Sequence, residues 1–321
     1  MIKSNILVTA IGTISSDCVI SSLRSFCSGK IIGCDIYPAE WHAVSDRFDA
    51  VLKAPLAKES EDYFDFIKEA CEAYSIDIII PLTDVEVDFF NDKRAYFIAE
   101  DILVTIGTKE FLSIARDKQK LNDFFRDDPA VHSVRTYAAW ELGRAEFPLI
   151  AKPRRGRSSE GIYYLNSIGD LRQDMDPEAY IFQEILEGQV CTVDYVRAAE
   201  TGNDFALPRM ELLRTKNGAG LTVETFKCAR IEELVHYIGE KLHATGCINM
   251  EFIVHKGEYY LIDINPRFSA GVGFSKLAGY DFVENHLLSF MHGDIVIPLE
   301  YDCFIAQKKM VDVINKVVVY E

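Results

Sequence analysis

The sequence predicts an α/β fold in two parts, a region built on a parallel sheet followed by a region of α+β character. Over the first 107 residues, short apolar runs alternate with amphipathic helical patterns, which is typical of a parallel sheet covered by helices. From about residue 108, strand patterns joined by short loops replace this alternation. The chain has 321 residues, of which 49% are hydrophobic, enough for two or three structural units with full cores.

The first region alternates strands and helices in order along the chain. Strands are predicted at residues 5–10, 30–36, 50–53, 76–80 and 102–105. Apolar residues at helical spacing predict helices after Gly12 and over residues 63–74. Thr83 and Glu86 fit a capping box, in which each side chain accepts a backbone N–H at the start of a third helix.

The loop after the first strand does not carry a dinucleotide-binding motif. Residues 10–16 contain a single glycine, Gly12, where the nucleotide fingerprint requires three. We interpret Gly12 as part of a tight turn and Asp35 as a strand-end residue rather than a ribose ligand. The region is therefore expected to be Rossmann-like in shape without binding NAD.

The second region begins with a helix and continues with strands. Thr108 is placed to cap a helix over residues 109–126 that is interrupted at residues 117–118. A later helix has an apolar face over residues 234–242 and is expected to end at Gly246. Strands are predicted at residues 147–152, 162–165, 180–186, 189–196, 247–254 and 258–264. Residues 310–320 of the tail are a candidate closing strand.

The composition excludes several classes of function. With 34 Lys and Arg against 50 Asp and Glu, the net charge is −16, which argues against nucleic acid as a partner. No apolar run approaches the roughly 18 residues of a membrane span, and no signal-peptide pattern is present, so a cytoplasmic protein without a membrane partner is expected. The eight cysteines include no CxxC pair, which favours reduced, mostly buried thiols over disulfides or a zinc site.

A hairpin near residue 256 carries the most informative polar residues. With a three-residue loop at residues 255–257, Glu251 is expected to face Leu261, and alternation places Glu251, Asp263 and Asn265 on one face. Two carboxylates and an amide oxygen form a set of hard oxygen ligands suited to Mg²⁺. Arg267 lies within reach of the same phosphates. The alternative is a half-exposed hairpin with ordinary polar positions, but buried acids require partners.

A basic loop provides the second signal. Lys152 ends a strand and is followed by a loop of glycines, serines and arginines up to Gly161. Glycines allow close approach of backbone N–H groups to a polyphosphate, and serines add donors. Alone, such a loop is more often a mobile surface turn. Paired with the carboxylate hairpin, it is interpreted as a lid over phosphates.

These motifs, in this order, resemble those of the ATP-grasp superfamily. The resemblance is to ligases related to the carbamoyl-phosphate synthetase large subunit, biotin carboxylase and the pyrrolysine-biosynthesis ligase, and it covers roughly residues 1–295. It implies a pre-ATP-grasp domain at residues 1–107, a two-lobed ATP-grasp domain at 108–295 and a tail at 296–321. Within the ATP-grasp domain, residues 146–186 would be a small lid lobe and 187–295 the catalytic lobe. The motifs that carry it are Asp117-Lys118, Ala151-Lys152-Pro153 with its loop, Gln183 to Gly188, Glu251, and Asp263 to Arg267.

The resemblance also implies roles for individual residues. Lys118 and Lys152 would hold the phosphates of ATP, and Lys152, Asn265 and Arg267 would form the catalytic set. Glu251, Asp263 and Asn265 would bind Mg²⁺ or Mn²⁺. The lid over the phosphates would include Gly156, Ser158, Ser159 and Gly161. The adenine and ribose would meet a hinge made of Gln183, Glu184, Ile185, Leu186 and Glu187.

The residues that bind the substrates are less specified. Arg214 and Lys216 lie on a Gly-containing loop that either clamps a carboxylate or forms a solvated hairpin tip. Thr83 and Asp84, after a parallel strand, are candidates for contacting an amine. Ser269 follows the metal strand and is a candidate for the acceptor site.

The function implied is that of an ADP-forming, ATP- and Mg²⁺-dependent carboxylate–amine ligase that works through an acyl phosphate. Its substrates would be a small carboxylate and an amine, and family analogy suggests a homodimer. Two alternatives remain. One is a relative that forms carboxyphosphate or carbamoyl phosphate, and the other is a non-catalytic, ATP-binding regulatory protein.

Overall fold

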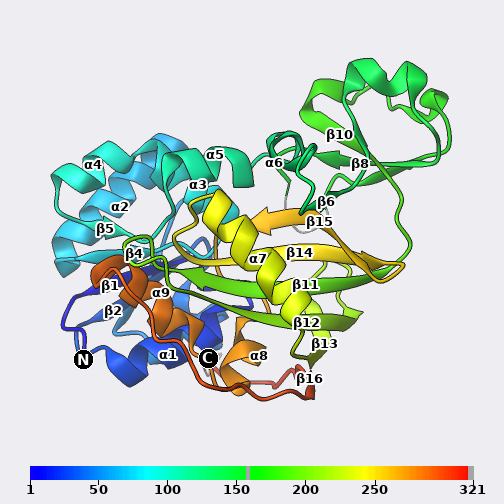
Figure 1. The fold of residues 1–321 in the computed structure, drawn as a ribbon. Coiled ribbons are helices and arrows are strands. Elements are labelled where there is room, and N and C mark those ends of the chain that lie inside the picture. Colours follow the sequence, from blue (N-terminus) through cyan, green and yellow to red (C-terminus); the bar gives the residue numbers. More distant parts are fainter. Residues whose placement is uncertain (157–159, 317–321) are drawn as a thin grey trace.

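The computed structural model describes residues 1–156 and 160–316 (Figure 1). Its elements form three sheets, and the mixed α/β class predicted from the sequence is confirmed. Figure 1 shows a small lobe containing β8 and β10 standing apart from the larger body. Within the described ranges, none of the helices combines the length and the apolar character needed to span a bilayer.

The N-terminal region is a parallel sheet in the order β3-β2-β1-β4-β5. Leu7 and Ile79 pack with α2 and α3 on one face, and Ile6 and Val8 pack with α1 on the other. Burial on both faces explains the continuous apolar runs of these strands. The elements are β1 (Ile6–Thr9), α1 (Ser16–Phe26), β2 (Ile31–Asp35), η1 (Ala39–Trp41), η2 (Ser45–Arg47), β3 (Ala50–Lys53), α2 (Ser60–Tyr74), β4 (Ile78–Ile80), α3 (Asp84–Asp92), α4 (Arg94–Ala99) and β5 (Leu103–Val104).

Thr83 caps α3 as predicted, and Glu86 has further buried partners. The Thr83 side chain accepts the N–H of Glu86, as expected. Burial raises the pKa of the Glu86 carboxyl, and hydrogen bonds from the Thr83 hydroxyl, at 2.7 Å, the Tyr63 hydroxyl, at 3.0 Å, and the Thr83 backbone oppose the rise. Tyr63, a buried tyrosine from α2, is a partner that local sequence does not show.

Two short helices lead into the second region. Thr108 caps α5 (Lys109–Ala115), and Asp117 caps α6 (Lys118–Phe125) by accepting the N–H groups of Gln119 and Lys120. The interruption predicted at residues 117–118 is therefore confirmed.

The small lobe is an antiparallel sheet in the order β7-β10-β8-β9. Tyr137, Leu149, Leu165 and Phe182 form its own apolar cluster. Its elements are β7 (Thr136–Tyr137), η3 (Ala139–Arg144), β8 (Leu149–Pro153), β9 (Tyr163–Leu165), η4 (Ile168–Asp170), η5 (Pro177–Ala179) and β10 (Tyr180–Glu184).

The large sheet has the order β16-β13-β12-β11-β14-β15-β6 and is antiparallel except where β6 joins β15. Its alternation is visible along β14, where Ile248, Met250 and Phe252 enter the apolar core with α7 while Asn249 and Glu251 line a cavity on the opposite face. The elements are β6 (His132–Ser133), β11 (Gln189–Arg197), β12 (Asp204–Arg214), β13 (Gly220–Thr225), α7 (Ala229–Lys241), β14 (Gly246–His255), β15 (Glu258–Asn265), α8 (Val272–Leu277), α9 (Phe282–Met291) and β16 (Ile305–Gln307).

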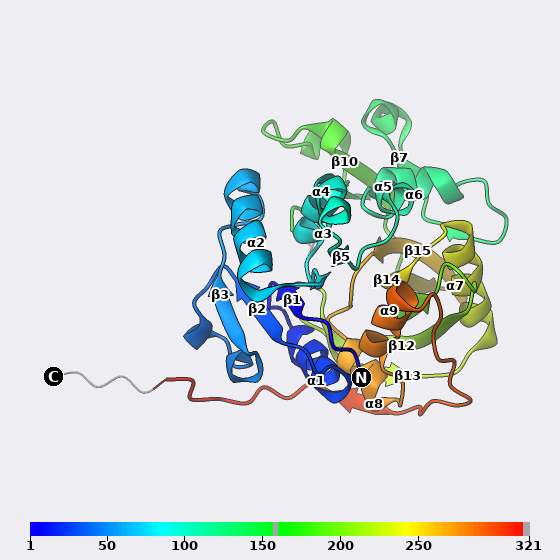
Figure 2. The same ribbon diagram turned by 90° about the vertical axis from the view of Figure 1, so that its left-hand side faces the viewer.

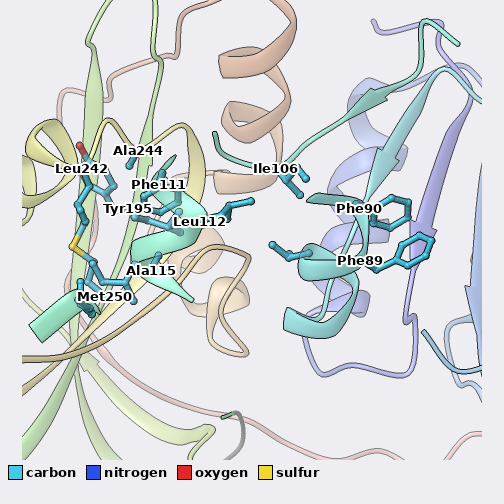
Figure 3. Close-up of a cluster of buried hydrophobic side chains, with 14 of the residues drawn as sticks. Phe89, Phe90, Ile106, Phe111, Leu112, Ala115, Tyr195, Leu242, Ala244 and Met250 are labelled. Atoms are coloured by element: carbon cyan, nitrogen blue, oxygen red, sulfur yellow. The ribbon is translucent and has the colours of Figure 1, made fainter. Parts of the chain in front are cut away.

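One continuous apolar cluster joins the N-terminal region to the large sheet. Figure 3 shows Ile106 and Leu112 between the phenylalanines of α3, Phe89 and Phe90, and residues such as Tyr195 of β11. The two regions therefore share one hydrophobic core, and burial of this apolar surface stabilises their contact.

Three details of the second region differ from the sequence prediction. α7 ends at Lys241 rather than Gly246, and Gly246 instead starts β14 with a positive φ of 77°. A closing strand of the tail lies at Ile305–Gln307, where it pairs with β13; residues 310–316 of the predicted range form no strand, and its remaining residues lie outside those described. Beyond β16 the described tail has no strand and runs toward η1, where Asn315 donates to the carbonyl of Glu40 (Figure 2).

Candidate active site

A cleft of about 730 Å³ lies between the small lobe and the large sheet. Residues from β8, β11, β12, β14 and β15 line it, together with the loops that follow β1 and β4 of the N-terminal sheet. It therefore collects side chains from all three sheets. In Figure 1 the small lobe stands over the end of the large sheet that carries β14 and β15.

The β14–β15 hairpin brings its polar residues to one side of this cleft. Glu251 is opposite Asp263, and Asn249 is opposite Asn265. The Asn265 side chain donates to the Asn249 amide oxygen at 3.2 Å. The cluster predicted from the sequence is thus assembled, and it includes Asn249, a further amide oxygen that alternation along the strand also indicates.

The register behind this cluster is different from the predicted one. The turn is a two-residue loop at Lys256-Gly257, both with positive φ, so that His255 rather than Val254 pairs with Glu258. A register shift between Glu251 and Phe252 then compensates for the shorter turn. Asp263 consequently faces the cleft although the assumed loop length was wrong.

Basic side chains neutralise both carboxylates of the hairpin. The Lys118 ammonium lies 2.9 Å and 2.8 Å from the two carboxylate oxygens of Asp263, and Arg214 lies 3.2 Å from Glu251. Burial raises the pKa of Glu251, and the Arg214 guanidinium opposes that rise. Each of the two carboxylates thus has one basic partner in the cleft.

Arg267 lies beside the same cluster and is held from the N-terminal region. Its guanidinium donates to Asp84 at 2.8 Å and lies 3.5 Å from the Asn265 oxygen. Asp84 is 2% exposed and also pairs with Arg116 at 3.4 Å. Burial raises the pKa of Asp84, but the Arg267 and Arg116 guanidinium groups lower it by more than burial raises it. The net shift of this pKa is downward. The carboxylate thus fixes the direction of Arg267.

Lys152 enters the cleft from β8 of the small lobe. Its ammonium donates to the Gln183 oxygen at 3.0 Å, and Gln183 in turn donates to Thr136 at 3.0 Å. Burial lowers the pKa of Lys152 to about 8, partly offset by the charge of Asp263. Lys152 thus loses its proton more easily than an ordinary lysine, and it lies near enough to Asp263 for that charge to affect its pKa.

The loop after Lys152 is described only in part. Gly156 lines the cleft, and Gly161 has a φ of 70°, a conformation that favours glycine. Ser158 and Ser159 lie outside the described residues. The loop's base is fixed because Arg154 donates two hydrogen bonds to Asp117, at 3.1 Å and 2.8 Å.

The predicted hinge residues are adjacent to the cleft but do not line it. Gln183 is buried and Glu184 and Glu187 are exposed, while Ile185 and Leu186 link β10 to β11. The same end of the cleft has an apolar lining that the sequence reading missed because it is assembled from separate strands. This lining consists of Ile150, Ile162, Val190, Ile253 and Ile262.

The substrate candidates divide into those that reach the cleft and one that does not. Thr83, Asp84, Arg214 and Ser269 line it. Lys216 is exposed at the tip of the β12–β13 loop and is absent from the lining. The solvated-tip alternative therefore describes Lys216, whereas Arg214 is inside.

A buried arginine closes one end of the cleft. Arg209 is 1% exposed and pairs with Asp194 at 2.7 Å and Glu211 at 3.2 Å, and it donates to Ser269 at 3.1 Å. A Cβ at Gly220 would lie 2.0 Å from a Glu211 oxygen, so a larger residue there would displace the carboxylate that pairs with Arg209.

The donor set fits a hard divalent cation. Glu251 and Asp263 each hold a basic side chain where a metal ion would supply positive charge, and the amide oxygens of Asn249 and Asn265 adjoin them. Among residues 1–156 and 160–316, no group of three or more His, Cys, Asp or Glu side chains is arranged to hold a metal unaided. Such a site would need amide oxygens and substrate phosphates to complete it.

The sequence of the segment that builds this cleft also matches a known protein family. Residues 115–271 match the family model of the ATP-grasp domain. The chain carries an ATP-grasp domain. The matched segment runs from the end of α5 to the residues after Arg267 and so includes Lys118, Lys152, Glu251 and Asp263.

Individual relatives agree with the ATP-grasp assignment. The carbamoyl phosphate synthase large chain of Clostridium beijerinckii is 24% identical over 221 residues, 60% of this chain and 20% of that one. Biotin carboxylase of Campylobacter jejuni has a TM-score of 0.75 at 17% identity, covering 92% and 72% of the two chains. An L-amino acid ligase of Bacillus licheniformis has a TM-score of 0.69 at 13% identity, covering 92% and 78%. The chain thus spans a small part of its curated relatives, and the structural likeness establishes the fold.

Proposed function

We propose that the protein is an ATP- and Mg²⁺-dependent, ADP-forming carboxylate–amine ligase that works through an acyl phosphate. The observation that carries this proposal is the meeting of two carboxylates, two amides, Lys118, Lys152 and Arg267 in one cleft. The ATP-grasp match and the likeness to named ligases support it.

ATP is proposed to lie along the cleft, with its base at the apolar end and its phosphates at the charged end. The isoleucines and Val190 offer an apolar surface between the small lobe and the large sheet. Lys118 and Lys152 would neutralise the phosphates, and Glu251, Asp263 and Asn265 would hold Mg²⁺. When bound, the metal would offset the charge that develops on the phosphate oxygens.

In the first proposed step, a carboxylate oxygen of the substrate attacks the γ-phosphorus of ATP. The new O–P bond forms as the bond to the β-phosphate oxygen breaks, and ADP leaves with the electron pair. Arg267, held by Asp84, is placed to stabilise the transferred phosphate. Preorganised charge of this kind is the main contribution a protein makes to phosphoryl transfer.

In the second proposed step, an amine nitrogen attacks the acyl carbon. A C–N bond forms, inorganic phosphate leaves with the electrons of the C–O bond, and the nitrogen loses a proton. A closed cleft would protect the acyl phosphate from water. We propose that residues 146–186 act as the lid lobe, 187–295 as the catalytic lobe and 1–107 as the pre-ATP-grasp domain.

Location and assembly are further parts of the proposal. All eight cysteines are free, and five are buried, which is consistent with a reducing, cytoplasmic environment. A homodimer is proposed by analogy alone and is tested by analytical ultracentrifugation. The similarity to carbamoyl phosphate synthase favours bicarbonate, and so a carboxyphosphate-forming reaction, as the second candidate.

The proposal is tested by ADP release from Mg·ATP with pools of amino acids, small dicarboxylates and bicarbonate, in the presence of hydroxylamine. Release that depends on one carboxylate pool, with a trapped hydroxamate, is expected. A Lys152→Ala, Asn265→Ala double variant should lose it. Release that depends on bicarbonate alone would favour the second candidate, and tight ATP binding without release would favour a regulatory protein.

Titration of Lys152 predicts how ATP affinity depends on pH. Because burial lowers its pKa to about 8, the ammonium is charged below this pH and loses its proton above it. The affinity for Mg·ATP should therefore fall above pH ~8, by up to about tenfold per pH unit. In Lys152→Arg the guanidinium does not titrate in this range, so the calorimetric affinity should be flat. The same decline in that variant would contradict the assignment.

A further inference from the structure

A second cavity, of about 520 Å³, lies at the carboxyl ends of β1, β2, β3 and β4. In open parallel sheets this edge is where ligands bind. Its lining includes Asp35 from the end of β2 and Glu86 from the first turn of α3. The proposed ATP chemistry uses neither residue.

Glu86 is distinguished from the other buried acids by its partners. It is 5% exposed, and its hydrogen-bond partners are neutral: the hydroxyls of Tyr63, Thr83 and Thr9 and the backbone of Thr83. Among the described residues, every other Asp or Glu residue that is at most 9% exposed as a whole has an arginine or histidine within ion-pair distance. These are Asp35, Asp84, Asp117, Asp194 and Glu211. Glu86 is therefore a buried acid without a cation, and an unpaired buried charge is costly.

The walls of the cavity are apolar and aromatic. Ala54, Leu56 and Ala57, after β3, form one wall. Tyr37 and Trp41 also line it, stacked with ring centroids 5.3 Å apart, although they are 50% and 66% exposed. Large, half-exposed aromatic side chains at a cavity offer a face to an apolar group or a cation.

Nucleotides and other phosphates do not suit this cavity. The N–H of Gly12, which a phosphate would need, donates to Asp35 at 2.8 Å. Asp35 also accepts the N–H of Tyr37 and lies 3.5 Å from His42. Of the lysines and arginines described, Lys58 alone lines the cavity, and it is exposed. The local charge therefore repels anions and attracts cations.

The cavity adjoins the proposed ATP cleft. Gly12, Thr13 and Thr83 line both. A ligand anchored beside Glu86 would therefore lie next to the space where the acyl phosphate is proposed to form. The same Thr83 hydroxyl that borders the cleft donates to Glu86.

We propose that this cavity binds the amine substrate, a compound whose ammonium group pairs with Glu86 and whose apolar or aromatic body packs against Leu56 and Trp41; transfer of one ammonium proton to the Glu86 carboxylate would free the nitrogen lone pair for attack on the acyl carbon. Its assignment to the amine substrate rests on the ligase function proposed above. The binding itself does not need ATP, so the two proposals are tested separately.

The probe is 2-phenylethylamine, titrated by calorimetry into the full chain without ATP, with 3-phenylpropionate as the anionic counterpart of similar size. Saturable binding of the amine and none of the acid is expected. Glu86→Gln should weaken amine binding by about tenfold or more, since a charged partner is lost. Trp41→Ala should weaken it by roughly threefold to tenfold.

Two further variants serve as a control and as a second test of the cavity. Trp140→Ala removes a tryptophan that is 78% exposed and outside the cavity lining, and it should bind the amine unchanged. Leu56→Lys places a cation on a partly exposed wall residue, so it should fold and lose the amine even if Glu86→Gln does not fold. Equal binding of acid and amine, or unchanged binding in Trp41→Ala and Leu56→Lys, would overturn the proposal. If hydroxylamine trapping works while the amine fails to bind, the ligase function stands and the subsite is wrong.

Discussion

Replacing Asp263 by asparagine should reduce ATP turnover by about a hundredfold to a thousandfold, the range for loss of one preorganised charged group at a reacting centre. Asp263 pairs with Lys118 at 2.8 Å and faces Glu251 across the hairpin. The neutral amide would weaken both the proposed magnesium site and the positioning of Lys118. The readout is ADP formation at saturating ATP as the Mg²⁺ concentration is raised.

The control for this prediction is Asp46→Asn, the same chemical change at an exposed position outside the cleft. Its turnover should equal that of the unmodified chain. Asp263 is partly exposed to the cleft, with a side chain 20% accessible, so its variant should fold. Normal turnover and normal Mg²⁺ dependence in Asp263→Asn would remove Asp263 from the proposed site.

Replacing Arg209 by methionine should lower the free energy of unfolding by about 3–5 kcal/mol, because removal of one partner leaves buried charges uncompensated. The guanidinium pairs with Asp194 and Glu211, whose side chains are 0% and 3% exposed. Urea unfolding, followed by circular dichroism, measures the change.

Two comparisons separate this effect from simple loss of packing. Arg135→Met, at an exposed ion pair with Glu146, should change stability by less than about 1 kcal/mol. A triple variant, Asp194→Asn, Arg209→Met and Glu211→Gln, should recover much of the loss because no charge is left buried. Equal stability of Arg209→Met and Arg135→Met would show that the buried network does not stabilise the fold.

The periodic features of the fold could be predicted from sequence, because each depends on a few neighbouring residues. Burial on both faces produced the apolar runs of β1 and β4, and Thr108 and Asp117 marked the helix starts. The convergence of Glu251 and Asp263 was predicted, but from a wrong register. A shorter turn and a register shift compensate for each other, and neither has a clear signature in one sequence.

Contacts between distant segments could not be predicted. Arg267 is fixed by Asp84, 183 residues earlier, and Lys118 meets Asp263 across 145 residues. Glu86 shows the same limit, since Tyr63, which donates to its carboxylate, comes from another helix. Such pairings depend on how whole sheets pack, and local patterns carry no information about them.

In the proposed reaction, a substrate carboxylate takes the γ-phosphoryl group of ATP in this cleft. The most direct test uses the carboxylate pool that supports ADP release, labelled with ¹⁸O in its carboxyl group, and mass analysis of the phosphate released. An acyl phosphate transfers one labelled oxygen to phosphate when the amine displaces it. Labelled phosphate is expected in amounts equal to ADP, and it should be absent in the Lys152→Ala, Asn265→Ala double variant. Unlabelled phosphate formed at the same rate as ADP would contradict the proposed reaction.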